Sequence, residues 1–347
     1  MEKRTSIVFL FCLLCVILLT SNAIAAEREG VVSVSKLGFT VEYSPTAEQI
    51  ASIADGVAQI DPAKLSAFLN SVDDKTLARV VEAYPNIKNL SISNAFHGSK
   101  GHVGTTTLAP LAKLTQLVSV TVKEFPNGQD IDLSVFESSK ELKEFFDQNN
   151  VNMNISPLGN IPSIERLNII RGPDNIAWIT KLTNLKFLSL GSNPLKDYTP
   201  IGKSTITQLS ISHGKDINLG FLSEMPQLTN LEISYSSGLS NFAALGKLNA
   251  LTHLRLDSIS GPVDLSFAKN LKNLQIFYMD KTPVTNFESL AGATNLAQLY
   301  MRGTTGVTSL EPIKELEKLF RLEVTKGVFS AEDLTGFPNK RLKPVEK

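Results

Sequence analysis

The sequence has 347 residues, 42% of them hydrophobic, which is enough to build a sizeable folded core. Its 34 basic and 34 acidic residues give a formal net charge of zero. A balanced chain has no sequence-wide attraction to polyanions, so we expect no nucleic acid among its partners and no charge-driven binding to a membrane surface.

Residues 1–25 have the pattern of a secretory signal peptide. Lys3 and Arg4 precede an apolar run at 7–19, which is shorter than the roughly 20 residues that span a bilayer. The small residues that follow offer a cleavage site ending at Ala25. An uncleaved membrane anchor is the alternative. We expect an exported protein, periplasmic or secreted, with no integral membrane segment after cleavage.

Both cysteines, Cys12 and Cys15, lie inside this segment. Lipidation requires a small residue before the cysteine, and these positions hold Phe11 and Leu14. The mature chain would then contain no cysteine and therefore no disulfide. Its stability would have to come from its core.

Residues 26–83 are predicted to form an N-terminal cap. Residues 27–43 alternate in polarity as VVSVS and FTVEY, which predicts a short hairpin. Three helix starts follow at 44–45, 61–62 and 73–74, where Ser or Asp precedes Pro or a second Asp. Apolar residues at helical spacing follow each start: Ile50, Ile53, Val57 and Ile60; Leu65, Phe68 and Leu69; Leu77, Val80, Val81 and Tyr84. A small recognition domain is the alternative to a cap.

Residues 84–324 repeat one motif, LxxLxxLxL, at a period of about 22 residues. Clear copies are LTNLKFLSL, MPQLTNLEI and LKNLQIFYM, and SKELKEFFD is a weak one. The third apolar position of the eleven copies falls at Leu90, Val120, Phe145, Leu167, Leu188, Leu209, Leu231, Leu254, Phe277, Leu299 and Leu322. The xLxLx part alternates with period 2, so each copy predicts a short strand with one buried face. Stacked copies would form a parallel sheet over one continuous core.

The second half of each repeat is also patterned, for example at Asn193, Leu195, Asp197, Pro200 and Ile201. The complete unit resembles the internalin-type bacterial leucine-rich repeat, LxxLxxLxLxxNxIxDIxPLxxL. This resemblance covers about residues 84–324 and implies an α/β solenoid, a right-handed leucine-rich-repeat horseshoe with an N-terminal helical cap. It is specific for fold and says little about function. No cell-wall sorting signal or wall-binding module is recognisable. Residues 325–347 are expected to close the solenoid with a short helix and a basic tail.

Motifs for chemistry are scarce. We find no phosphate-binding loop, nucleophile elbow or HExxH motif, and we expect no cofactor, no metal and no enzymatic activity. His97 and His102 lie five residues apart in a glycine-rich loop with no further ligand nearby. His213 is expected to be solvated at a turn, and Trp178 to be a core or edge aromatic on the convex side.

The outward face of the predicted sheet is the remaining candidate site. The x residues of each xLxLx form two outward rows, which are small and plain in the middle of the chain. In the last repeats they gather aromatic and charged residues of the kind enriched at binding hot spots. The candidate residues are Glu232, His253, Arg255, Asp257, Tyr278, Asp280, Tyr300, Arg302 and Glu323.

These observations predict a binding protein that engages a protein partner, from its own organism or a host, through its concave face. The alternative is a module that binds polysaccharide or peptidoglycan, for which Tyr278, Tyr300 and Arg302 would supply stacking and hydrogen bonds. A hydrolase is disfavoured, because no acid, base and nucleophile cluster is recognisable.

Overall fold

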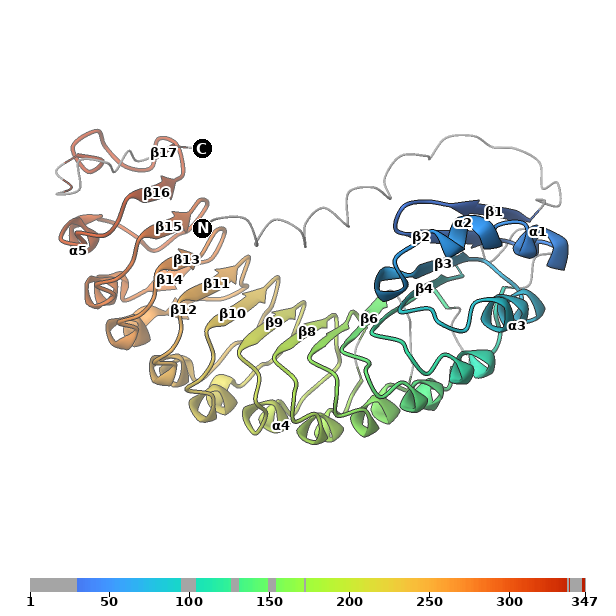
Figure 1. The fold of residues 1–347 in the computed structure, drawn as a ribbon. Helices are drawn as coiled ribbons and strands as arrows, with labels where there is room; N and C mark the ends of the chain where they lie inside the picture. The colour runs from blue at the N-terminus through green and yellow to red at the C-terminus, as the bar shows by residue number, and fades with distance from the viewer. Residues whose placement is uncertain are drawn as a thin grey trace.

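The computed structural model describes residues 30–94, 104–125, 131–148, 154–171, 173–335, 337 and 345–346. The predicted signal peptide and the loop with His97 and His102 lie outside these residues. The described chain forms a curved solenoid in which strands line the inner side of an arc and short helical turns line its outer side (Figure 1).

The described residues form a 15-stranded sheet, and all of its strands except the first run parallel. In order they are β1 (Val31–Val34), β2 (Gly38–Glu42), β3 (Ser66–Asn70), β4 (Asn89–Ser93), β5 (Ser119–Lys123), β6 (Glu144–Gln148), β7 (Arg166–Ile169), β8 (Phe187–Gly191), β9 (Gln208–Ser212), β10 (Asn230–Ser234), β11 (His253–Asp257), β13 (Ile276–Tyr278), β15 (Gln298–Met301), β16 (Arg321–Val324) and β17 (Val345–Glu346). A second, two-stranded sheet joins β12 (Val263–Asp264) to β14 (Val284–Thr285).

The strand register is the one that the repeat predicts. The eleven third apolar positions pair with one another in an unbroken series from Leu90 to Leu322. All eleven are at most 3% exposed. Because side chains alternate along a strand, burying this series also fixes which residues face outward on the concave side.

Short helical turns cross the outer side of the arc. They are η2 (Ala109–Lys113), η3 (Leu133–Ser138), η4 (Ser156–Asn160), η5 (Ala177–Lys181), α4 (Thr199–Gly202), η6 (Leu219–Glu224), η7 (Phe242–Lys247), η8 (Leu265–Asn270), η9 (Phe287–Gly292) and α5 (Glu311–Lys314). Asn or Asp precedes most of them, and its side-chain oxygen accepts a hydrogen bond from the N–H two residues later, as at Asp197 and Asp264. Asn286 Nδ2 also donates to Asp264 Oδ1 at 2.7 Å, which links neighbouring turns.

The N-terminal cap differs in part from the prediction. The hairpin is confirmed as β1 and β2, and α3 (Asp74–Ala83) begins at Asp73, whose carboxylate accepts from the N–H of Thr76 at 2.6 Å. The first helix is divided into α1 (Ala47–Ala51) and α2 (Ala54–Ala58).

The helix predicted after residue 61 is wrong. Only η1 (Pro62–Lys64) is helical, and the chain then enters β3. Leu65, Ala67 and Leu69 alternate inward at 8%, 0% and 0% exposure, and β2 and β4 pair on either side. The segment fits a strand and a helix equally well in sequence, and its two strand neighbours decide the outcome. The parallel sheet therefore continues into the segment expected to be the cap.

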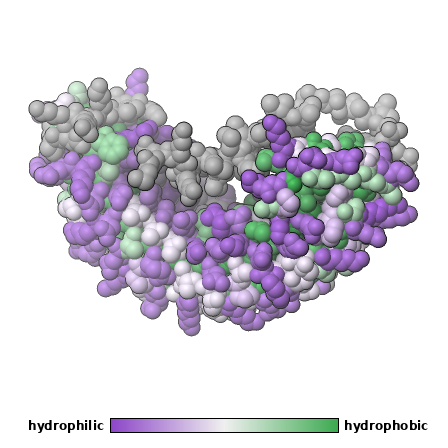
Figure 2. Space-filling view, viewed as in Figure 1, coloured by the Kyte–Doolittle hydropathy of each residue, from purple (hydrophilic) through white to green (hydrophobic). Residues whose placement is uncertain are grey.

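The C-terminal end also lacks its predicted helix within the described residues. Residues 331–335 form turns, in which the Leu334 N–H donates to the Ser330 carbonyl at 3.2 Å and the Thr335 N–H donates to the Glu332 carbonyl at 3.1 Å. Figure 2 shows a largely hydrophilic outer rim and hydrophobic residues gathered toward the N-terminal end. Within the described part of the chain, no helix has both the length and the apolarity needed to cross a bilayer.

Candidate functional site

Four side chains form a continuous stack across the concave face of β11, β13, β15 and β16. The guanidinium carbon of Arg255 lies 4.0 Å from the centre of the Tyr278 ring. The rings of Tyr278 and Tyr300 are 4.3 Å apart and inclined by 11°. Arg321 lies 5.3 Å from the centre of the Tyr300 ring. Arg255, Tyr278 and Tyr300 occupy equivalent positions on strands about 4.8 Å apart, so their flat side chains lie close enough to stack, and Arg321 reaches Tyr300 from two residues before the equivalent position. We call these four residues the arginine–tyrosine stack.

Two aspartates tie the strands together beside this stack. Asp257 Oδ1 accepts from the Asp280 N–H at 2.9 Å, and Asp280 Oδ1 accepts from the Arg302 N–H at 2.6 Å. The same carboxylates pair with the guanidinium groups of Arg255 and Arg302. Burial raises the pKa of Asp257, although Arg255 opposes the shift. The hydrogen bond to Asp280 raises the pKa of Arg302. The outward side chains of these aspartates and arginines thus form ion pairs and hydrogen bonds within the site.

The sequence suggested that Glu323 and Tyr300 face solvent, but both side chains are buried. Glu323 is 1% exposed and Tyr300 is 8% exposed. Arg321 Nε donates to Glu323 Oε1 at 3.0 Å, and Arg302 Nη1 lies 3.7 Å from Glu323 Oε2. Tyr300 donates its hydroxyl proton to Gln298 at 2.7 Å, and burial raises its pKa. Both side chains are therefore covered by their neighbours and contribute little exposed surface to the site.

Glu232 and His253 border the same cluster on its N-terminal side. Glu232 Oε1 lies 3.7 Å from Arg255 Nε. His253 is half-buried, and its Nδ1 lies 2.8 Å from the hydroxyl of Thr252. Burial lowers the pKa of His253, which favours the neutral ring. All nine predicted residues therefore lie in one contiguous patch of β10 to β16, which we call the C-terminal cluster together with Arg321.

The exposed part of the C-terminal cluster consists of guanidinium groups and, at its N-terminal border, the side chain of Glu232, which is 47% exposed. The side chains of Arg302 and Arg321 are 42% and 47% exposed, whereas those of Asp257 and Asp280 are each 13% exposed. Both faces of the Tyr278 ring are covered, by Arg255 and Tyr300. The cluster therefore presents guanidinium groups, ring edges and Glu232, and its other acids are largely covered.

A second, smaller cluster was missed in the sequence. Arg166 lies 4.4 Å from the centre of the Phe187 ring and 3.7 Å from the carboxylate of Glu144. These residues pair in register on β6, β7 and β8. They repeat the acid, arginine and aromatic order of Glu232, Arg255 and Tyr278. Each of these residues directly precedes the first inward residue of its strand. They form a third outward row, which was not among the two rows from which the candidate site was predicted.

Other candidates contribute little to this face. No group of three or more His, Cys, Asp or Glu side chains in the described ranges is arranged to hold a metal. His213 is exposed, as expected, and it stacks on Tyr235 at 5.2 Å, which the sequence did not indicate. Trp178 lies half-buried on η5, on the outer side.

Parallel strands on the inner side and capped helical turns on the outer side define a leucine-rich-repeat solenoid of the internalin type. The fold is similar to that of an internalin (inlF) from Listeria monocytogenes, with a TM-score of 0.57 and 19% identity over 86% of this chain and 93% of that one. It is also similar to a leucine-rich-repeat protein of Leptospira interrogans, with a TM-score of 0.50 and 17% identity over 85% and 86% of the two chains. No protein-family model matches the sequence, and no curated protein is significantly similar to it. The predicted resemblance is confirmed for the fold.

Proposed function

We propose that this chain is an exported binding protein that holds a protein partner against its concave face, centred on the C-terminal cluster. The arginine–tyrosine stack carries this proposal. Tyrosine and arginine dominate binding hot spots, and side chains that are ordered before binding lose less conformational entropy when a partner arrives. The stack supplies both properties at one place.

Binding is favoured over catalysis because the acids of the cluster are already engaged. Asp257, Asp280 and Glu323 each pair with an arginine. The oxygens of these carboxylates are occupied by guanidinium groups, and those of Asp257 and Asp280 also by backbone N–H groups, so few lone pairs are left to accept a proton from a substrate. The cluster is therefore suited to recognition.

A polysaccharide partner is the alternative for the concave face. Stacking on a sugar needs an accessible ring face, and neither Tyr278 nor Tyr300 offers one. Ring edges and guanidinium groups are instead suited to the carbonyl, carboxylate and aliphatic groups of a protein. The geometry thus gives more support to a protein partner.

The test has two stages. Crosslinking pulldowns with the mature chain, from extracts of its own organism and of a host, would identify the partner. We expect that replacing Tyr278, Tyr300 and Arg302 with Ala weakens its binding at least tenfold, about 1.4 kcal/mol. The matched control, Ala at Ser189, Ser210 and Ser212, should bind normally. Normal binding by the first variant, with binding lost on changes in residues 93–107 or in the N-terminal helices, would place the contact elsewhere.

Export is supported by the charged, apolar and small-residue segments of residues 1–25. We expect the mature chain to begin at Ala26, or at Glu27 if cleavage falls one residue later. Intact-mass measurement of protein from the medium or periplasm checks this. A full-length chain in the membrane fraction would contradict it.

A further inference from the structure

A row of side chains follows the strands along one rim of the solenoid, away from the concave cluster. It holds one residue per repeat, in the order Arg171, Ser192, His213, Tyr235, Ser258 and Lys281. From Ser192 onward the backbone of each residue in this row is left-handed, with φ between 43° and 56°. The N–H groups of Ser192, His213 and Tyr235 still donate to the next repeat at 2.9–3.0 Å. We call this series the rim row.

The fold does not require aromatic residues in the rim row. Ser192 and Ser258 adopt the same backbone conformation as His213 and Tyr235. Tyr235 is nevertheless 63% exposed, and it stacks on His213 with the rings inclined by 11°. An exposed, ordered aromatic pair with no role in the core is typical of a ligand-binding surface.

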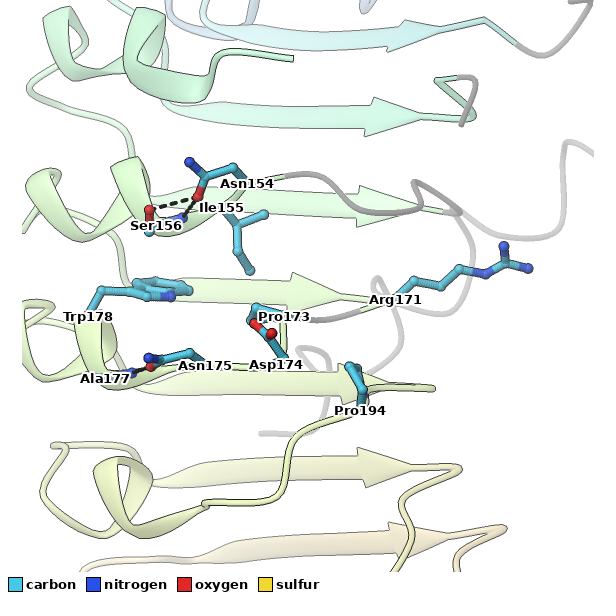
Figure 3. Close-up of a pocket in the computed structure, with 10 residues that line it drawn as sticks. All are labelled: Asn154, Ile155, Ser156, Arg171, Pro173, Asp174, Asn175, Ala177, Trp178 and Pro194. Carbon is cyan, nitrogen blue, oxygen red and sulfur yellow. Dashed lines mark hydrogen bonds between the residues drawn. The ribbon is translucent and has the colours of Figure 1, made fainter. Parts of the chain in front are cut away.

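Two adjoining hollows lie beside the rim row. The first, of about 680 Å³, is lined by Asn154, Arg171, Asp174, Asn175, Trp178 and Pro194 (Figure 3). The second, of about 720 Å³, is lined by Ser192, Asn193, Pro194, Lys196, His213 and Lys215, with Asp216. Pro194 belongs to both, so the hollows follow one another across consecutive repeats. Each has the volume of an ordinary ligand site. We call the pair the rim groove.

The rim groove carries positive charge that the fold leaves unpaired. Arg171, Lys196 and Lys215 are exposed and form no ion pair with any residue that the structure describes. Asp174 and Asp216 are the acids among its lining residues. This differs from the C-terminal cluster, where each arginine pairs with a carboxylate.

The groove also holds oriented amide donors. The Oδ1 atoms of Asn154 and Asn175 accept from the N–H groups of Ser156 and Ala177 at 3.2 and 2.8 Å. Each Nδ2 therefore faces away from its turn, and neither donates to another described residue. Asn193 is 8% exposed, and its Nδ2 also lacks a partner among the described residues. Asn154 and Asn175 thus supply amide donors from two successive repeats, and the Nδ2 atom of Asn193 in the next repeat is unpaired within the described chain but buried.

We propose that the rim groove binds an extended acidic polysaccharide. Trp178 at one end and the His213–Tyr235 pair at the other supply ring surfaces for the C–H faces of sugar rings. The amides suit sugar hydroxyls, and Arg171, Lys196 and Lys215 suit carboxylates on the chain. Repeats are about 4.8 Å apart along the sheet, which is close to the length of one sugar unit, so an extended chain can follow the groove across consecutive repeats.

Gly159 helps to position Trp178 at the first hollow. A Cβ atom at Gly159 would lie 3.1 Å from Cβ of Trp178. The absence of a side chain there lets Trp178 lie against the neighbouring repeat while it still lines the first hollow. The position of this ring is therefore set by the stacking of repeats.

The test uses calorimetric titration of the mature chain with a galacturonic acid hexamer. We expect binding that weakens as salt is raised, and no binding of a neutral maltohexaose or of a poly-glutamate peptide. Two variants, Trp178→Ala with Tyr235→Ala and Lys196→Glu with Lys215→Glu, should each weaken binding at least fivefold. Lys281→Glu, the same charge change in the rim row beyond the groove, should not.

Several results would overturn the proposal. They are absence of hexamer binding, equal binding of poly-glutamate, or equal losses in the Lys281→Glu variant. Thermal melts confirm that each variant is folded. The variant with Ala at Tyr278, Tyr300 and Arg302 should bind the hexamer normally, so failure of the rim site and failure of the concave site are distinguishable.

Discussion

The central repeats and the C-terminal repeats share one scaffold and present different concave surfaces. Leu188 and Leu209 in the centre pair and are buried in the same way as Phe277 and Leu299 further on. The outward residues beside them are serines in the centre, at 189 and 210, and stacked tyrosines in the C-terminal part. Inward positions are constrained by packing, whereas outward positions can change without altering the fold.

The two regions also differ in how firmly their outward side chains are held in place. In the C-terminal part, Asp257 and Asp280 join backbone and guanidinium groups of neighbouring strands. The central serines at 189 and 210 make no comparable cross-strand side-chain pairs in the part of the chain described. A surface that is both aromatic and held in place has the features of a preformed contact site.

The largest expected effect comes from placing a charge at an inward position of one central repeat, compared with the same charge at the neighbouring outward position. Leu188→Asp buries a charge in a fully packed position, and we expect a loss of roughly 4 kcal/mol or more. Ser189→Asp, one residue away on the concave face, should cost under about 0.5 kcal/mol. Urea unfolding followed by circular dichroism measures both. Similar midpoints for the two variants would mean that the inward and outward positions are misassigned.

A smaller effect should separate the two acid–arginine–aromatic clusters. Arg166→Ala with Phe187→Ala removes the central cluster, which lacks the second tyrosine and the aspartate bonds. We expect partner binding to weaken by no more than about threefold, or about 0.7 kcal/mol. The comparison is with the tenfold loss expected for the C-terminal variant in the same binding assay. A loss of tenfold or more would extend the contact surface across the centre and remove the contrast.

The ladder of buried positions could be predicted from sequence because its signal is repeated eleven times. Period-2 alternation at a fixed spacing leaves one register for the sheet, so Leu90 to Leu322 were placed correctly. A single segment has no such redundancy. Residues 61–70 carry a capping Asp before Pro and apolar residues that suit a helix, yet pairing with β2 and β4 makes most of them a strand. Local preference is a weaker determinant than tertiary pairing there.

The proximity of the candidate residues to one another was also predictable, but their burial was not. Row positions place Tyr278 beside Tyr300 from the register alone. Glu323 pairs with Arg302 and Arg321, and its strand is also flanked by β17, which pairs at Glu323 itself. Alternation tells which way a side chain leaves the strand and nothing about which long side chains then cover it. The His213–Tyr235 pair gave no signal for a different reason: both residues lie one position beyond the two outward rows, after Ser212 and Ser234.

The smallest expected effect tests whether the border of the C-terminal cluster is desolvated, unlike exposed positions elsewhere. Burial lowers the pKa of His253 below the ordinary 6.5. Its flanking residues at the same level of the sheet are Asn230 and Ile276, so no carboxylate there stabilises the charged ring. As the pH falls below about 6.5, the unfolded chain takes up a proton at this position more readily than the folded chain, and stability decreases.

We therefore expect the wild type to lose more stability between pH 7.5 and 5.5 than the His253→Gln variant does. Urea unfolding midpoints at the two pH values measure this difference. Identical pH dependence in wild type and His253→Gln would show that the border is solvated, and the distinction between a preformed C-terminal surface and an open central one would then be weaker.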